Sequence, residues 1–188
     1  MKIALHLILP ALLLLLGACS SVTADADWDT NVDFTKLKTW SFLHKAPPTT
    51  GNPDLDNHLF HERVRKAVRE SFAEKGLVEA KDGQKPDLLV TYTANVRQKV
   101  DVDYVSNYYG YGSYHWGGWA SIDKQVRVND VGNLLLDLLV PQDDGRPKLA
   151  WRGSAEAYVQ KDRTPEQKYE LILEAVNKML TWFPPPHR

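Results

Sequence analysis

The sequence predicts an α+β fold: a mostly antiparallel sheet with two main helices packed on one face, as a two-layer sandwich. Two segments, residues 54–76 and 164–183, repeat apolar side chains at the spacing of an amphipathic helix. Between them the apolar period shortens to two residues, as in strands with one buried and one wet face. Because about 100 to 200 residues usually make one domain, we expect a single folded domain.

Residues 54–76 form the first expected helix. Its apolar stripe comprises Leu55, Leu59, Phe60, Val64, Ala67, Val68 and Phe72. Asp54 or Asp56 can cap the first turn, because a short carboxylate accepts hydrogen bonds from free backbone N–H groups. Gly76 can end the helix in a left-handed conformation, with Leu77 supplying a hydrophobic contact.

The second expected helix begins after Thr164. Thr164 can cap it, Pro165 suits the first helical position, and Gln167 can close a capping box. The buried stripe is expected to comprise Tyr169, Ile172, Val176, Met179, Leu180 and Phe183. Three consecutive prolines, residues 184–186, then end the helix.

The strands lie mainly between these helices. Residues 88–104 alternate apolar and polar side chains and predict one long strand. Residues 134–140 are almost all apolar and favour a central strand, and residues 141–145 turn it back into an alternating strand over 148–160. The second face of the sheet carries Thr, Arg, Lys and Asp side chains, so we expect it to face solvent.

Two more strands are expected upstream, at Trp28 and at residues 38–43, with a turn at 33–37 between them. Four tryptophans lie on elements with apolar patterning and are expected to pack in the core: Trp28, Trp40, Trp151 and Trp182.

The first eighteen residues resemble a secretory signal peptide that ends in a bacterial lipobox. Lys2 precedes an apolar run that is too short to cross a bilayer comfortably as a helix. The run ends in the letters LGAC, and Cys19 is the one cysteine of the chain. The resemblance implies that residues 1–18 are removed and that Cys19 becomes lipidated, with acyl chains such as palmitate anchoring the protein stably in a membrane.

The residues after Cys19 indicate a location. Ser20, rather than aspartate, resembles the outer-membrane sorting choice of Gram-negative bacteria, so we expect a lipoprotein on the periplasmic face of the outer membrane. Residues 19–26 lack apolar periodicity and are expected to form a lipidated tether, which leaves residues 27–188 as the domain. With a single cysteine, no intramolecular disulfide can form.

A series of short motifs, in this order and spacing, resembles the bacterial lipoprotein family called domain of unknown function 4136. The motifs are DWD at 27–29, DF at 33–34, KTW at 38–40, EKGL at 74–77, PDLLV at 86–90, WRG at 151–153 and FPP at 183–185. An aromatic and glycine-rich insert separates the fifth motif from the sixth. The resemblance covers essentially the whole mature chain and implies an envelope lipoprotein with a sheet-and-helices fold. It implies no activity and no site.

The composition argues against two functional classes. The formal net charge is −1, with acids and bases interspersed, whereas nucleic-acid binding calls for a basic patch. No catalytic set is recognisable, because lipidation consumes the one thiol and Ser154 lacks the G-x-S-x-G elbow that exposes a nucleophilic serine. We therefore expect no enzyme activity, no nucleic-acid partner and no cofactor besides the covalent lipid at Cys19.

His58 and His61 are weak candidates for metal ligands. At a spacing of three residues they share one face of a helix, and with Asp56 and Glu62 nearby they offer donors that suit zinc or copper. The spacing matches no zinc-protease pattern, however, and a solvated first turn with acids near the helix N-terminus explains the same residues. An envelope enzyme that uses this region, metal-dependent or hydrolytic, is the alternative function.

The main candidate site is the aromatic insert at about 104–120. It holds four glycines and a set of broad aromatic side chains with polar tips: Tyr108, Tyr109, Tyr111, Tyr114, Trp116 and Trp119. Three interpretations remain open. The rings bind an envelope protein, peptide or glycan, as aromatic hot spots do; they rest at the lipid headgroup boundary; or the insert is unstructured and its rings fold back on the sheet.

Together these observations favour a non-enzymatic binding or assembly module of the cell envelope, held to its membrane by the lipid at Cys19. A purely structural role, as a spacer between other proteins, is a further alternative. It differs from binding in that scrambling the order of the insert would have no effect.

Overall fold

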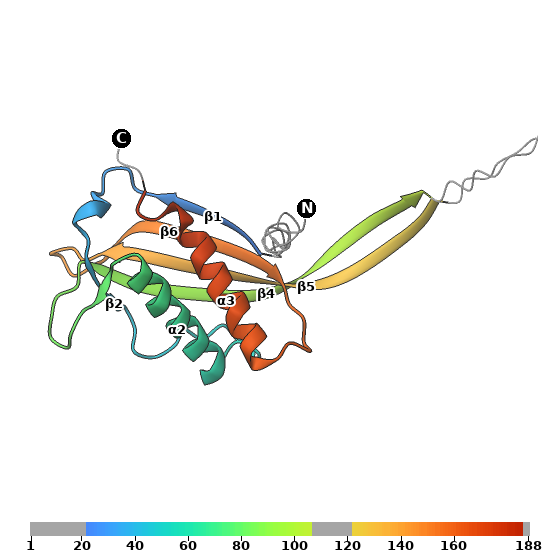
Figure 1. Ribbon diagram of the computed structural model, residues 1–188, viewed down its shortest axis with the longest axis horizontal. Coiled ribbons are helices and arrows are strands. Elements are labelled where there is room, and N and C mark those ends of the chain that lie inside the picture. Colours follow the sequence, from blue (N-terminus) through green and yellow to red (C-terminus); the bar gives the residue numbers. More distant parts are fainter. Residues whose placement is uncertain (1–21, 107–121, 186–188) are drawn as a thin grey trace, which may run out of the picture.

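The computed structural model describes residues 22–106 and 122–185, with side chains described except over 101–127 (Figure 1). This part of the chain forms six strands, two α-helices and two short 3₁₀ helices. They are β1 (Val22–Trp28), η1 (Phe34–Lys36), β2 (Thr39–Phe42), α2 (His58–Glu74), β3 (Val78–Glu79), β4 (Leu88–Ser106), β5 (Ile122–Val140), β6 (Lys148–Tyr158), α3 (Pro165–Met179) and η2 (Leu180–Trp182). The strand order is β1-β6-β5-β4-β2-β3.

The sheet is mixed and mostly antiparallel. Strand β2 runs parallel to both of its neighbours, β3 and β4, while the other pairs are antiparallel. The expected sheet with two helices is confirmed at this level, and the parallel pairing is an addition to it. Asp87 fixes this pairing, because its carboxylate accepts hydrogen bonds from the backbone N–H groups of Lys38 (3.0 Å) and Thr39 (2.8 Å).

Both helices lie over the same face of the sheet (Figure 1), and the helices and strands share one apolar core. Helix α3 contacts β1, β6 and α2. Fully buried side chains in this core include Val64, Val68, Phe72, Leu88, Val90, Leu136, Leu138, Trp151, Val176 and Met179. No helix in the described ranges has the length and apolarity needed to span a bilayer.

Helix α2 begins later than expected. Asn57, and neither of the two expected aspartates, caps it by accepting a hydrogen bond from the Phe60 N–H (3.0 Å). Asp56 instead accepts hydrogen bonds from the backbone of Thr50 and Gly51 and so closes the preceding loop. The three polar residues stand close together in sequence, and only the loop geometry decides which of them becomes the cap.

The C-terminus of α2 follows the prediction. Gly76 has a φ of 76°, a conformation that glycine adopts without steric cost. The N–H of Leu77 donates to the carbonyl of Phe72 (2.9 Å), and the N–H of Gly76 donates to the carbonyl of Ala73 (3.0 Å). These two bonds satisfy helix carbonyls that would otherwise lack a donor. Leu77 itself is buried, as its expected hydrophobic contact requires.

Helix α3 carries the predicted capping box. The N–H of Gln167 donates to Thr164 Oγ1 (3.3 Å), and the Thr164 N–H donates to Gln167 Oε1 (2.9 Å). Of the expected stripe, the C-terminal four residues are buried, whereas Tyr169 and Ile172 are half-buried. Tyr169 lies at the contact between the helices, where its hydroxyl donates to the carboxylate of Glu70 on α2.

The expected tether is corrected over residues 22–26, which belong to strand β1. β1 pairs with β6 from Val22↔Ala157 to Trp28↔Trp151. Its helix-facing positions are Val22, Ala24, Ala26 and Trp28, and the residues between them are Thr23, Asp25 and Asp27. The alternation is therefore present, but small alanines against exposed aspartates give too weak an apolar contrast to distinguish an edge strand from a linker.

The four tryptophans differ in burial. Trp40 and Trp151 are buried in the core, as expected, and Trp28 is half-buried. The expectation for Trp182 is wrong, because 40% of its surface is exposed. Trp182 lies in the 3₁₀ turn η2, whose tighter winding moves it off the helical stripe.

Candidate binding surface

Strands β4 and β5 extend beyond the rest of the sheet as a two-stranded arm (Figure 1). Their antiparallel pairing runs without interruption from Leu89↔Leu139 to Ser106↔Ile122. On one side β6 pairs with β5 only as far as Val131, and on the other β2 pairs with β4 only as far as Val90. We call residues 98–106 and 122–130 the arm. At about 3.4 Å per residue it is about 30 Å long.

The base of the arm carries an uncovered apolar pair. Val100 and Val128 are directly opposite each other, and each is 58% exposed. Because side chains alternate along a strand, Val100 lies on the same face as Val96, which packs against the core beneath the helices. The apolar face of the sheet thus continues onto the arm, where no described helix covers it.

The opposite side of the sheet is a polar face. Its polar residues are Thr23, Asp25 and Asp27 of β1, Arg152, Ser154 and Glu156 of β6, Asn133 and Asp137 of β5, and Thr91, Thr93, Asn95 and Arg97 of β4. Two apolar residues of β5, Leu135 and Val131, interrupt them on the same face. Arg152 donates two hydrogen bonds to Asp137, both 2.7 Å long. The hydrogen bonds and negative charge of this carboxylate raise the pKa of Arg152.

A second ion pair joins this face to the base of the arm. Arg97 Nη2 lies 2.5 Å from Glu156 Oε1, and Asn133 donates to the same oxygen (3.3 Å). The polar face therefore presents rows of side-chain hydrogen-bond donors and acceptors along the strands of the sheet.

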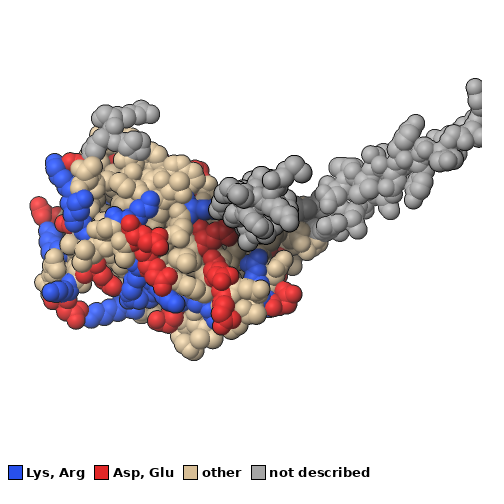
Figure 2. All heavy atoms as spheres, in the orientation of Figure 1, with Lys and Arg blue, Asp and Glu red and all other residues tan. Residues whose placement is uncertain are grey.

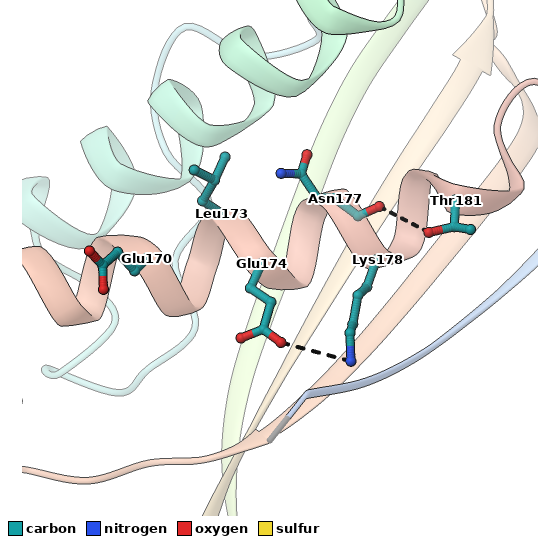
Figure 3. A pocket seen from close by; sticks show the side chains of 6 residues that line it. All are labelled: Glu170, Leu173, Glu174, Asn177, Lys178 and Thr181. Carbon is teal, nitrogen blue, oxygen red and sulfur yellow. Dashed lines mark hydrogen bonds and ion pairs between the residues drawn. The ribbon is translucent and has the colours of Figure 1, made fainter. Parts of the chain in front are cut away.

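The helix side carries mixed charge. Figure 2 shows Lys and Arg side chains interspersed with Asp and Glu over the described part of this face. An open depression of about 540 Å³ lies along α3 and is lined by Glu170, Leu173, Glu174, Asn177, Lys178 and Thr181 (Figure 3). Lys178 is engaged with Glu174 (3.8 Å) and with the carbonyl of Val22 (2.6 Å). Its charge thus serves packing of α3 against β1.

His61 is buried, which corrects the expectation of a solvated first turn. Only 4% of its surface is exposed, and its Nδ1 lies 3.0 Å from the hydroxyl of Tyr92 on β4. Burial lowers the pKa of His61, the positive charge of Arg65 acts in the same direction, and the carboxylates of Asp56 and Glu62 oppose it. Burial also raises the pKa of Tyr92. The pair is neutral and structural near pH 7.

Acid should therefore destabilise the fold through His61. Unfolded histidine takes up a proton near pH 6.5, whereas folded His61 does so only at lower pH, so the unfolded state gains protons first. The free energy of unfolding should fall as the pH drops through this window, by at most about 1.4 kcal/mol per pH unit for one proton. His61→Gln, which keeps a hydrogen-bonding group without a titrating charge, should lose this component. Urea unfolding of both proteins at about pH 8 and about pH 5 measures it; parallel losses in the two would contradict the assignment.

The two histidines do not form a shared site. His58 is exposed while His61 points into the core toward Tyr92. Within residues 22–100 and 128–185, no three His, Cys, Asp or Glu side chains are grouped so as to hold a metal ion. This arrangement gives no support to the alternative of a metal-dependent enzyme.

The other candidates lie outside the described residues. These are the lipidation residue Cys19 and the aromatic side chains Tyr108, Tyr109, Tyr111, Tyr114, Trp116 and Trp119. The structure does describe where the insert is attached. Residues 104–106 of the expected insert belong to strand β4, and Ser106 is the register partner of Ile122 at the end of the arm.

The fold and the arm can be compared with known proteins. The sequence profile of a family described as Domain of unknown function (DUF4136) matches residues 24–185. The chain belongs to this family. The match begins within β1, which agrees with the domain starting earlier than the expected residue 27. No curated protein matches the sequence of this DUF4136 member.

Solved structures show the same fold at low sequence identity. A DUF4136 family protein from Bacteroides thetaiotaomicron is 14% identical, with a TM-score of 0.53, and the match covers 88% of this chain and 97% of that one. A PDZ domain protein from Parabacteroides distasonis is 16% identical, with a TM-score of 0.50 and 89% of this chain covered. The match spans 36% of that longer protein. These similarities establish the fold of the DUF4136 domain alone.

Two features of the surface escaped sequence reasoning. The β5 part of the arm was signalled only by Val126 and Val128 alternating with polar residues, a pattern that Lys124 and Asp130 interrupt and that does not reveal where neighbouring strands stop. The burial of His61 was signalled by its phase, since it lies three and seven residues before Val64 and Val68 on the buried stripe.

Proposed function

We propose that this DUF4136 protein is a non-enzymatic binding or assembly module of the cell envelope. In this proposal the lipid at Cys19 holds the domain at the periplasmic face of the outer membrane. The aromatic insert and the adjoining sheet edge contact an envelope protein, peptide or glycan. No nucleic acid and no cofactor other than the lipid take part.

The arm is the observation that carries the proposal. A paired ribbon about 30 Å long places the attachment points of the insert well beyond the core. Because neither β6 nor β2 pairs with it, this ribbon extends the reach of the domain beyond its core. The composition of the insert supplies the contact chemistry, because Tyr and Trp bury large areas at low cost in side-chain entropy.

The position of the anchor supports the same picture. β1 begins at Val22, three residues after Cys19, so fully extended chain separates them by at most about 11 Å. Val22 pairs with Ala157, which pairs with Gly132, which pairs with Val96 near the base of the arm. The anchored terminus and the arm therefore leave the same end of the sheet. We further take the helices and sheet to form a two-layer sandwich, which leaves the polar face available to a partner.

In-cell photocross-linking tests this proposal on the full-length, lipidated protein. Probes placed singly at Tyr111 and Trp116 should each give a discrete adduct with an envelope component, because aromatic contacts dominate such interfaces. A probe at Arg69 on the exposed face of α2 is the control, and one at Thr93 samples the polar face. Adducts are separated on gels and identified by mass spectrometry.

The outcomes separate the interpretations. A discrete adduct from the insert but not from Arg69 supports a binding module. Lipid adducts alone would indicate an insert that rests at the membrane surface and would overturn the binding proposal. Equal labelling from all four probes would mean random encounter and would overturn it as well.

A further inference from the structure

Among the residues that the structure describes, the arm has an edge along β4 that pairs with no other strand. The N–H of Leu43 donates to the carbonyl of Val90 (2.8 Å), so the backbone groups of even-numbered β4 residues point toward the β2 side. In the described residues no strand pairs with β4 on that side beyond Val90. From Tyr92 to Ser106 the even-numbered residues thus present a row of N–H and C=O groups suited to a further strand.

This edge lacks several of the usual protections. The β4 and β5 ladder contains no register shift over its whole length, so no bulge twists the edge away. The sequence from residue 92 to residue 106 contains no proline. A two-stranded ribbon is also marginally stable in water, and a third strand or more stabilises it. The arm is therefore built to accept another strand.

The order of charges identifies which strand fits. Along the odd-numbered positions β4 carries Arg97 and Lys99 and then, in sequence, Asp101 and Asp103. The first two lie on the polar face, where the Lys99 ammonium is 5.9 Å from the ring of Tyr158. Consider a second, antiparallel copy of this strand, related to the first by a two-fold axis at Val100. Position 99 of one copy then lies opposite position 101 of the other, and position 97 lies opposite position 103. Every directly opposite charged pair then has opposite signs.

Neighbouring registers lack this property. An axis at position 99 places the two copies of Lys99 opposite each other, and an axis at position 101 does the same for Asp101. An axis at position 98 places Arg97 opposite Lys99, and an axis at position 102 places Asp101 opposite Asp103; by symmetry each of these like-charge pairs occurs twice. Directly opposite like charges destabilise a sheet, while opposite charges stabilise it. Position 100 is also even-numbered, so its backbone N–H and C=O groups point outward and residue 100 of each copy can form a hydrogen-bonded pair with the other at the axis.

We infer that the occupant of this edge is a second copy of the chain. The two arms join through antiparallel β4–β4 pairing about Val100, which gives a four-stranded ribbon with two-fold symmetry, the commonest symmetry of protein dimers. The exposed Val100 side chains then meet at the axis. This inference concerns the edge of β4 and does not depend on what the insert binds.

Cysteine cross-linking of the full-length protein in its membrane tests the register. Residues directly opposite in a hydrogen-bonded pair have Cα atoms about 5.5 Å apart, which a disulfide can bridge. Val100→Cys should therefore give a disulfide-linked dimer. Val128→Cys is the matched control, because it is equally exposed but lies on β5. In the dimer its two copies are three strand spacings apart, about 14 Å, which is too far for a disulfide.

A charge swap in the Val100→Cys background supplies the second measurement. Lys99→Asp replaces two attractive pairs by two repulsive ones, so the dissociation constant of the dimer should rise about tenfold. Adding Asp101→Lys restores opposite signs and should restore cross-linking. Resistance to protease confirms that each variant is folded.

Each outcome of these two measurements either supports the β4–β4 dimer or overturns it. Cross-linking through Val100→Cys but not Val128→Cys, reduced by Lys99→Asp and restored by adding Asp101→Lys, supports the dimer. Equal cross-linking through Val100→Cys and Val128→Cys, a monomer in both, or a charge swap that fails to restore the dimer would overturn it.

Discussion

Replacing Trp40 by alanine should lower the free energy of unfolding by about 3 to 5 kcal/mol. Trp40 is 1% exposed and lies in β2 beneath α2. Its ring makes edge-to-face contacts with Phe42, at 5.1 Å between centroids, and with Phe72 of α2, at 4.9 Å. Truncation removes both contacts and leaves a cavity that the parallel β2–β4 pairing cannot collapse to fill. Urea unfolding followed by far-UV circular dichroism measures the loss.

Trp182→Ala is the matched control for this change. The residue type is the same, but Trp182 is 40% exposed and belongs to the short helix η2. We expect a change of about 0.5 kcal/mol, as at an ordinary surface position. Similar losses for the two tryptophans would contradict the different burial that the structure assigns to them.

Gly153→Val should cost about 1 to 3 kcal/mol through overpacking. A Cβ atom at this position would lie 2.5 Å from Trp151 Cη2 and 2.8 Å from Met179 Cβ. Glycine is required here for space, since it lets α3 approach β6 closely. The added side chain should push α3 away from the sheet. Calorimetry should show a lower melting temperature, by about 2 to 4 °C per kcal/mol for a domain of this size.

Ser154→Val, one position further, separates this effect from the change in residue type. Ser154 is half-exposed on the polar face, where side chains point away from α3. Valine also suits a strand, so we expect little change in stability. Equal destabilisation by the two substitutions would mean that the strand itself resists valine and that the seat of α3 is elsewhere.

The helices and central strands could be predicted because their signals are local. The capping box at Thr164 and the stop at Gly76 each involve residues a few positions apart, and the same residues make those bonds in the structure. The parallel pairing of β2 with β4 could not be predicted. It depends on Asp87 reaching Thr39, and the sequence pattern of β2 is the same whichever strand lies beside it.

The amino-acid composition of the candidate binding surface could be predicted from the sequence, but the projecting arm that carries it could not. Aromatic side chains and glycines mark the insert in any reading of the sequence. The arm, in contrast, exists because β6 and β2 end earlier than β4 and β5, which is a relation between four strands. The burial of His61 likewise depends on Tyr92 of β4 supplying a partner for a polar ring.

The pairing of β1 with β6 sets the order in which the protein can mature. β1 begins three residues after Cys19, the lipidation site in the proposed function, yet its partner strand β6 lies near the other end of the sequence. Under that proposal the chain is exported from its N-terminus, so β1 is delivered first and β6 almost last, and contacts between such distant segments form slowly. β1 then lacks its partner strand until β6 follows. In the proposed function, closure of the sheet is therefore a late step that comes after lipid attachment and cleavage at Cys19.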